Sequence, residues 1–327
     1  MVLGAALAAG LSAGPAMSQD FFGESWGYAS EDQAITLRGG FGVIGIEARE
    51  HVFAGAGSPD NLSLLIWQTA APMANVEVDV KLPEQWTVKA RVTAALFGDS
   101  YMEDYDWFGP DFVSYDFDDW THRSQHPNTN LDWYLDASLA VGRDVIVEPN
   151  ARVNLNGGIK YTDVQWTAVG GSYIYSDDFD VDHAGDHFHA HTGTLADVPG
   201  ITYRQQIPVL FAGLDAEVTD GQWTYEAGAQ AGIALFARGD DHHWLRDLRF
   251  LDTINAAPML GASATASYAF SDSLDLFVTG SVEKVFLSRG DTEYYDIPSG
   301  VQTGASIDAA GLELGTISLA GGLKGSF

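Results

Sequence analysis

The sequence lacks cysteine, has few basic residues and contains no long apolar run. Without cysteine, its 327 residues cannot form a disulfide-stapled scaffold, a thiolate nucleophile or a zinc–thiolate site. Only 16 Lys and Arg stand against 45 Asp and Glu, a formal charge of −29, so a phosphate backbone would be repelled and we expect no nucleic-acid partner. Beyond the N-terminus, no stretch reaches the roughly 18 consecutive apolar residues of a transmembrane helix, which excludes a helical membrane protein.

The N-terminal residues 2–18 carry no charge and consist largely of Ala, Gly, Leu and Val. The stretch is too short for a membrane-spanning helix. We interpret it as the apolar core and cleavage region of a signal peptide, with residues 16–18 (AMS) as the small-x-small site. Because the first basic residue is Arg38, the natural start is expected upstream; a disordered tail is the alternative. We expect a signal peptide at 1–18 and a single β-barrel domain at 19–327.

Apolar and polar residues alternate through much of the chain. In residues 76–82 and 85–97 every second side chain is apolar, and residues 317–327 repeat the pattern. One apolar and one polar face is what a lipid-exposed barrel needs, and a sheet in hydrocarbon must close so that its backbone groups are all paired. A soluble β-sandwich also alternates. The terminal Phe327 resembles the end of bacterial outer-membrane barrels and favours a barrel.

Turn residues divide the chain into short and long connections. We expect short turns near residues 82–84, 142–144, 219–221 and 271–273, and long connections over 53–61, 105–130, 170–199, 242–256 and 288–308. Five long and four short connections predict ten strands, with both termini on the short-turn, periplasmic side. The predicted fold is all-β: a ten-stranded antiparallel transmembrane β-barrel with long extracellular loops, in the bacterial outer membrane.

Two short acidic motifs fall at strand ends in this arrangement. Asp104 and Asp106 lie two residues apart, as do Asp241 and His243, and this spacing on an extended chain points both side chains to one face. Both motifs reach the extracellular rim, where three carboxylates and an imidazole could converge and activate a water molecule. Alone, an Asp-x-Asp pair is usually a solvated turn, so a catalytic role depends on both motifs lying at one rim.

Four further segments resemble the omptin family of outer-membrane proteases. They are residues 120–129 (WTHRSQHPNT), 170–176 (GGSYIYS), 203–205 (YRQ) and 322–327 (GLKGSF). With the two acidic motifs, they follow the family order from about residue 35 to the C-terminus. The resemblance implies an aspartic-type endopeptidase built on a ten-stranded barrel, with its active site in a groove at the outer mouth.

The resemblance also assigns roles to the four catalytic candidates. His243 would be the general base that activates water, oriented and kept basic by Asp241. Asp104 would help to hold the water from across the groove. Asp106 would share a proton with Asp104 and hydrogen-bond the carbonyl oxygen, because neighbouring like charges raise one pKa. The reaction implied in this way needs no metal and no other cofactor.

The family typically cleaves next to basic residues, and Glu50 aligns with the acid that receives the basic side chain before the scissile bond. Two positions depart from the family pattern. Gly239 replaces a second acid, with Asp240 adjacent to it, and His122 stands where an acid often serves the residue after the bond. We expect Glu50, Asp240 and His122 to bind substrate, with a basic residue preferred before the bond and a looser choice after it.

Features outside the catalytic motifs leave alternatives open. The acids of 99–119 and 177–186 form either a solvated rim or an electrostatic funnel for basic peptides. The four His residues within 183–191 either bind a metal or belong to a polar loop, and we favour the loop. Omptins generally require lipopolysaccharide, and Gln165 and Gln206 occupy positions where basic residues would hold it. Lipopolysaccharide is therefore a candidate activator, with its dependence reduced or rebuilt from other residues.

We predict a monomeric outer-membrane endopeptidase that hydrolyses peptide bonds next to basic residues, with its active site facing the cell exterior. Its partners would be basic peptides or proteins and the lipid of the outer membrane. The alternative is a catalytically silent surface barrel, an adhesin or receptor that binds cationic partners. A channel is disfavoured, because ten strands leave a narrow lumen that side chains such as Lys89 and Arg91 would fill.

Overall fold

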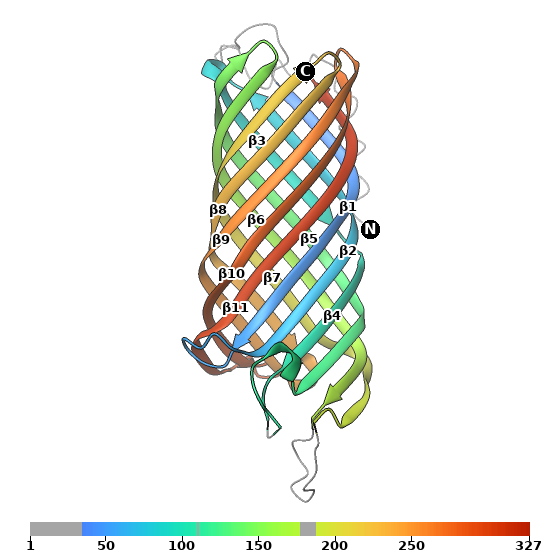
Figure 1. The fold of residues 1–327 in the computed structure, drawn as a ribbon, viewed down its shortest axis with the longest axis vertical. Helices are drawn as coiled ribbons and strands as arrows, with labels where there is room; N and C mark the ends of the chain where they lie inside the picture. The colour runs from blue at the N-terminus through green and yellow to red at the C-terminus, as the bar shows by residue number, and fades with distance from the viewer. Residues whose placement is uncertain (1–34, 110, 177–187) are drawn as a thin grey trace, which may run out of the picture.

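The computed structural model describes residues 35–109, 111–176 and 188–327, which form a β-barrel (Figure 1). Its strands are β1 (Ile35–Phe53), β2 (Asn61–Lys81), β3 (Trp86–Ala95), β4 (Asp99–Asp106), β5 (His122–Glu148), β6 (Ala151–Tyr175), β7 (His191–Asp220), β8 (Trp223–His243), β9 (Leu248–Ser271), β10 (Leu274–Asp296) and β11 (Gln302–Ser326). Three 3-10 turns, η1 (Pro83–Gln85), η2 (Phe117–Asp119) and η3 (Trp244–Arg246), lie in connections. The expected signal peptide at 1–18 falls outside the described residues.

The sheet closes on itself, because β1 pairs antiparallel with both β2 and β11. β3 and β4 each pair with β2 and β5 and lie end to end between them. The eleven strands therefore occupy ten strand positions around the barrel. The strand is interrupted at residues 96–98, between β3 and β4. At Gly98, an added Cβ would lie 2.7 Å from the Ala70 carbonyl oxygen. The predicted ten-stranded antiparallel barrel is confirmed. Over the described ranges, no helix is long and apolar enough to cross a membrane.

The outer wall is apolar over the half of the barrel that holds the ends of the chain. Large apolar side chains point outward there, including Phe41, Ile159, Leu260 and Ile317, each at least 53% exposed. On β1 these outward residues end at Val43, well before the strand does. An apolar outer band of this kind is what hydrocarbon requires of a barrel. We call it the lipid belt.

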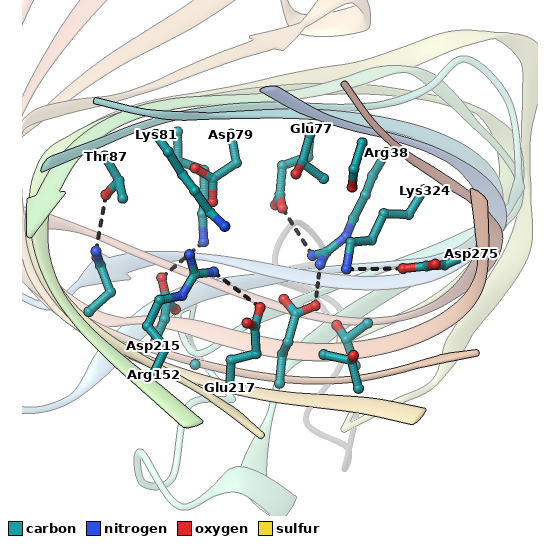
Figure 2. A pocket seen from close by; sticks show the side chains of 18 of the residues that line it. Arg38, Glu77, Asp79, Lys81, Thr87, Arg152, Asp215, Glu217, Asp275 and Lys324 are labelled. Carbon is teal, nitrogen blue, oxygen red and sulfur yellow. Dashed lines mark hydrogen bonds and ion pairs between the residues drawn. The ribbon is translucent and has the colours of Figure 1, made fainter. Parts of the chain in front are cut away.

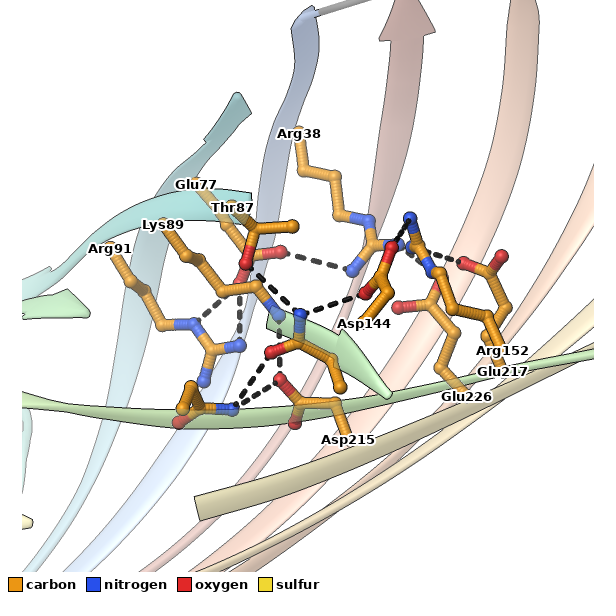
Figure 3. A network of polar contacts seen from close by, with 12 residues as sticks. Arg38, Glu77, Thr87, Lys89, Arg91, Asp144, Arg152, Asp215, Glu217 and Glu226 are labelled. Atoms are coloured by element: carbon orange, nitrogen blue, oxygen red, sulfur yellow. Dashed lines mark hydrogen bonds and ion pairs between the residues drawn. The ribbon is translucent and has the colours of Figure 1, made fainter. Parts of the chain in front are cut away.

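The lumen inside the lipid belt is filled by ion pairs (Figures 2 and 3). Arg38 reaches Glu77 at 3.1 Å and also binds Glu226, while Lys89 binds Asp215 at 3.0 Å. Further pairs join Arg91 to Glu77, Arg152 to Asp144 and Glu217, and Lys324 to Asp275. Charges removed from bulk water are costly unless they are paired. Lys89 and Arg91 therefore lie where they were expected, inside the lumen.

At the opposite rim, the strands run further than the sequence predicts. The expected connections 242–256 and 288–308 shrink to residues 244–247 and 297–301, because β9 and β10 continue into them. Beyond the lipid belt the outer face of the sheet meets water, so the strands continue there without outward apolar residues. The alternating pattern that marks a strand in the sequence is therefore missing from these segments. The turn expected at residues 142–144 is wrong: these residues lie inside β5, and the chain turns at 149–150.

Candidate active site

One wall of the rim carries Glu50, Asp104 and Asp106. In the ladder, Glu50 on β1 pairs with Leu65 on β2, and Leu65 pairs with Asp104 on β4, so the two acids lie in one row across the sheet. Asp106 is two residues further along β4 and therefore has the same phase. Ser63, opposite Asp106, donates a hydrogen bond of 3.3 Å to Oδ1 of Asp104.

The facing wall carries Asp241 and His243 on β8. Their two-residue spacing places both side chains inside the barrel, where they are 2% and 8% exposed. Nε2 of His243 lies 2.6 Å from Oδ2 of Asp241, and the ring of Phe250 packs edge-on against the imidazole. With Nε2 as the donor to the carboxylate, Nδ1 is the nitrogen left to accept a proton.

A cavity of about 300 Å³ separates these two walls at the rim. Side chains from both sides line it, among them all four catalytic candidates and the predicted substrate-binding acid: Asp104, Asp106, Asp241, His243 and Glu50. The arrangement depends on strand phase and direction, because β4 and β8 reach the same rim from distant parts of the chain. Phe108, Leu248, Phe250 and Tyr294 supply apolar and aromatic lining.

Burial and crowding shift the protonation of these groups, all of which lie beyond the lipid belt. Burial, reinforced by the charge of Asp104, holds the pKa of Asp106 well above its usual value. Burial also raises the pKa of Asp104 to about 6; His243 opposes this shift and Asp241 adds to it. Burial disfavours the charged form of His243, but the charge and hydrogen bond of Asp241 outweigh it, so the pKa of His243 is raised. Near neutral pH, the acid pair can thus hold a proton beside an imidazole.

Glu50 is a buried acid with no basic partner among the residues that the structure describes. It is 1% exposed, and its Oε2 has no hydrogen-bond partner among the described residues. Burial, followed by the charges of Asp241, Asp252 and Asp104, raises the pKa of Glu50 well above its ordinary value. An acid in this setting gains most from a cationic side chain that brings hydrogen-bond donors.

The other two predicted substrate-binding residues lie outside the cavity lining. Asp240 is half-buried and accepts hydrogen bonds from Nε and Nη2 of Arg249, at 2.7 and 2.8 Å. His122 pairs with Asp106 in the β4–β5 ladder and stacks on Phe108, with ring centroids 4.7 Å apart. Asp240 can therefore act on the cavity only through its charge, whereas His122 borders the cavity behind the Phe108 ring.

Two residues near the cavity were missed by the sequence analysis. Arg246 lines it from η3, directly after His243. Asp252 on β9 pairs with Gly239 on β8 and is 3% exposed. The only sequence signal for Asp252 is its place in the hairpin that follows His243, and the register of that hairpin depends on the length of its turn.

In the described part of the His-rich segment, His189 packs against an aromatic side chain. His189 stacks on Trp120 with ring centroids 3.7 Å apart, and its Nε2 lies 2.6 Å from the Trp120 carbonyl oxygen. His183 and His187 fall outside the described residues. Across residues 35–109, 111–176 and 188–327, no group of three His, Asp or Glu side chains is arranged to hold a metal ion.

Comparisons with known proteins agree with the barrel fold. The model of the omptin family matches residues 31–327. The chain is similar to the plasminogen activator of Yersinia pestis, with 26% identity over 72% of this chain and 70% of that protein. It is also similar to the outer membrane protease OmpP of Escherichia coli, with 24% identity over 95% of this chain and 94% of that protein. The crystal structure of the outer membrane protease OmpT from Escherichia coli superposes with a TM-score of 0.80 at 23% identity, covering 93% of this chain and 100% of that one.

Proposed function

This chain belongs to the omptin family, and we propose that it is an outer-membrane protease that cleaves next to basic residues by activating water with an Asp–His pair. The observation that carries the proposal is the cavity in which Asp104 and Asp106 on one wall face Asp241 and His243 on the other. No single motif supplies this arrangement, because two strands far apart in the sequence contribute to it.

The proposed reaction is an aspartic-type hydrolysis without a covalent intermediate. A water held between Asp104 and His243 gives a proton to Nδ1 of His243 as its oxygen attacks the peptide carbonyl carbon. Asp241 stabilises the imidazolium that forms. Protonated Asp106 donates a hydrogen bond to the carbonyl oxygen as negative charge develops there. The intermediate then collapses as His243 returns its proton to the leaving amine, giving an amine and a carboxylic acid, which releases its remaining proton to water.

Glu50 is the proposed acceptor of the basic side chain before the scissile bond. Its buried, unpartnered oxygen supports this role, since a carboxylate accepts charge-assisted hydrogen bonds from Lys or Arg. Asp240 is already bound to Arg249, so its contribution would be the weaker attraction of a nearby charge. With His122 in place of an acid, selection after the bond would be looser.

The proposed orientation puts the active site outside the cell. The site lies at the rim opposite the chain ends and beyond the lipid belt, and the longer connections, such as residues 107–121, lie at this rim. Long connections face the exterior in outer-membrane barrels, and short turns face the periplasm. The barrel closes within a single chain, which supports a monomer.

We also propose that lipopolysaccharide activates this protein only weakly, because few uncompensated basic side chains lie where its phosphates would bind. Arg204 is forked to Asp163 at 2.8 and 2.6 Å, so its charge is already neutralised on the outer wall. Gln206 donates to the Tyr161 hydroxyl at 2.7 Å and carries no charge. Activity measured with and without lipopolysaccharide tests this proposal.

The decisive experiment is a peptide-library digest by the refolded barrel and by a His243→Ala variant. His243→Ala should abolish cleavage next to basic residues. His242→Ala is the matched control, because His242 lies beside Asp240 at 3.4 Å and does not line the cavity. Unchanged turnover by His243→Ala would overturn the mechanism. Binding of basic peptides without cleavage by the unmodified barrel would favour a surface receptor instead.

A further inference from the structure

A row of buried polar side chains runs across three neighbouring strands, two residues from Asp241 of the proposed catalytic pair. Gln205 on β7 pairs with Gly239 on β8, which pairs with Asp252 on β9. Paired residues of a ladder point to the same face, and Gly239 has the phase of Asp241, so Gln205 and Asp252 also face the lumen. Gln205 is fully buried and Asp252 is 3% exposed.

Gly239 leaves the space that the Asp252 carboxyl occupies. A Cβ added to Gly239 would lie 3.4 Å from Oδ2 of Asp252 and 3.2 Å from the Tyr203 hydroxyl. These contacts place the Asp252 side chain against the bare backbone of β8. The position that lacks an acid on β8 is therefore covered by an acid from the adjacent strand.

Three buried acceptors near this row are unpaired. Oε2 of Glu50, Oδ1 of Asp241 and Oε1 of Gln205 are all buried and have no hydrogen-bond partner among the described residues. Unpaired buried acceptors are costly, and each of these side chains is at most 2% exposed. A ligand that brings several N–H donors and a positive charge would satisfy them together.

The charge of Asp252 acts on Glu50. Besides burial, the leading influences on the pKa of Glu50 are the charges of Asp241, Asp252 and Asp104, and all of them raise it. Burial, followed by the charge of Asp241, raises the pKa of Asp252 to about 7. The charge of the neighbouring Asp240 also raises both pKa values, but unlike Glu50 this acid is bound by Arg249.

We infer that Asp252 is a specificity-determining residue, which together with Glu50 binds the basic side chain that precedes the scissile bond. Asp252 lies two residues from Phe250, which lines the cavity, so a long cationic side chain entering beside Glu50 would meet Asp252 at its far end. The inference rests on the proposed proteolytic function.

The test compares matched peptides that carry arginine or its neutral isostere citrulline before the scissile bond. Asp252→Asn keeps the shape of the side chain and removes its charge, and Asp252→Ser is a second variant. Both should lower kcat/KM for the arginine peptide by about 10- to 100-fold, the effect of losing one charge-assisted hydrogen-bonding partner. They should change the citrulline value by less than about 3-fold. Asp220→Asn, at an exposed acid that ends β7 at the opposite rim, is the control and should leave the arginine-to-citrulline ratio unchanged.

The ratio of the two kcat/KM values does not depend on the fraction of enzyme that has folded, so a merely structural role would not alter it. An unchanged ratio in both Asp252 variants would overturn this inference alone, provided that the unmodified protein cleaves the arginine peptide. An equal fall in the ratio for Asp220→Asn would also overturn it. Failure of the unmodified protein to cleave any library peptide would overturn the proposed function, and this inference with it.

Discussion

Nε2 of His243 lies 2.6 Å from Oδ2 of Asp241, and both side chains are buried on the same face of β8. The contact fixes the imidazole and stabilises its protonated form, so the pKa of His243 is raised despite burial. The second carboxylate oxygen, Oδ1 of Asp241, has no partner among the described residues. One carboxylate oxygen of Asp241 thus contacts the imidazole, and the other faces the acid-lined space next to Glu50.

Asp241→Asn should lower kcat by about 10³-fold or more, because the imidazole loses the group that orients it and stabilises its charge. His243 must be neutral to accept a proton, so kcat/KM of the unmodified protein should rise as the pH passes the pKa of His243. Without the Asp241 charge that pKa falls, and the rising limb should move to lower pH. Residual activity with an unmoved limb would show that Asp241 does not act through His243. The measurement is a pH profile of kcat/KM for both proteins.

Asp104→Asn and Asp106→Asn should differ in their effect. Burial holds the pKa of Asp106 well above its usual value, so an amide, which also donates a hydrogen bond, mimics its working form. Asp104 must accept a hydrogen bond from the attacking water, and an amide does this less well. We expect a loss in kcat of about tenfold for Asp106→Asn and about 10²- to 10⁴-fold for Asp104→Asn. The reverse order in single-turnover rates would exchange the two proposed roles.

Much of the site was predictable because strand phase is a local property. Two-residue spacing placed Asp104 with Asp106, and Asp241 with His243, whatever the details of the rim. Counting turns then directed both motifs to the same end. The structure brings these four side chains to one cavity.

What the sequence could not supply depends on packing between strands. Gly142 was expected in a turn, but it lies within β5, where an added Cβ would come within 2.3 Å of Oδ1 of Asn154; its small size serves close packing in the lumen. Asp252 escaped notice because only the register of the β8–β9 hairpin places it against Gly239. That register follows from the short η3 turn, and composition gives no guide to it.

The stability of the rim should fall as pH rises from about 4 to about 7. Burial raises the pKa of Asp104 to about 6 and that of Asp252 to about 7, from an ordinary 3.8. The folded protein therefore binds more protons than the unfolded chain over this range, so the contribution is complete below pH 4 and lost as pH passes 6 to 7. Urea unfolding in detergent at pH 5 and pH 8 should show a loss of about 4 kcal/mol, because the folded pKa values of the two carboxyls lie about 1 and 2 units above pH 5.

Asp252→Asn should flatten this pH dependence, because it removes one of the two titrating groups. Asp118→Asn is the control, since Asp118 is an exposed acid on η2, and it should leave the slope unchanged. A slope that persists undiminished in Asp252→Asn would assign the pH dependence to other groups.

Glu77→Gln should destabilise the barrel without changing its chemistry. Glu77 binds both Arg38, at 3.1 Å, and Arg91, whose Nε lies 2.7 Å from Oε2 (Figure 3). Removing the carboxylate takes away the ion-pair partner of Arg91 and leaves Arg38 with Glu226 in the lumen. Breaking a buried pair costs about 3–5 kcal/mol, and we expect about 3 kcal/mol here because the Arg91 side chain is 42% exposed.

Lys81→Gln, a change at an exposed residue of the same lumen, should cost less than about 1 kcal/mol. Urea unfolding midpoints measure both variants, and kcat/KM on a basic peptide should stay unchanged in the folded fraction of each, because the proposed active site lies at the opposite rim.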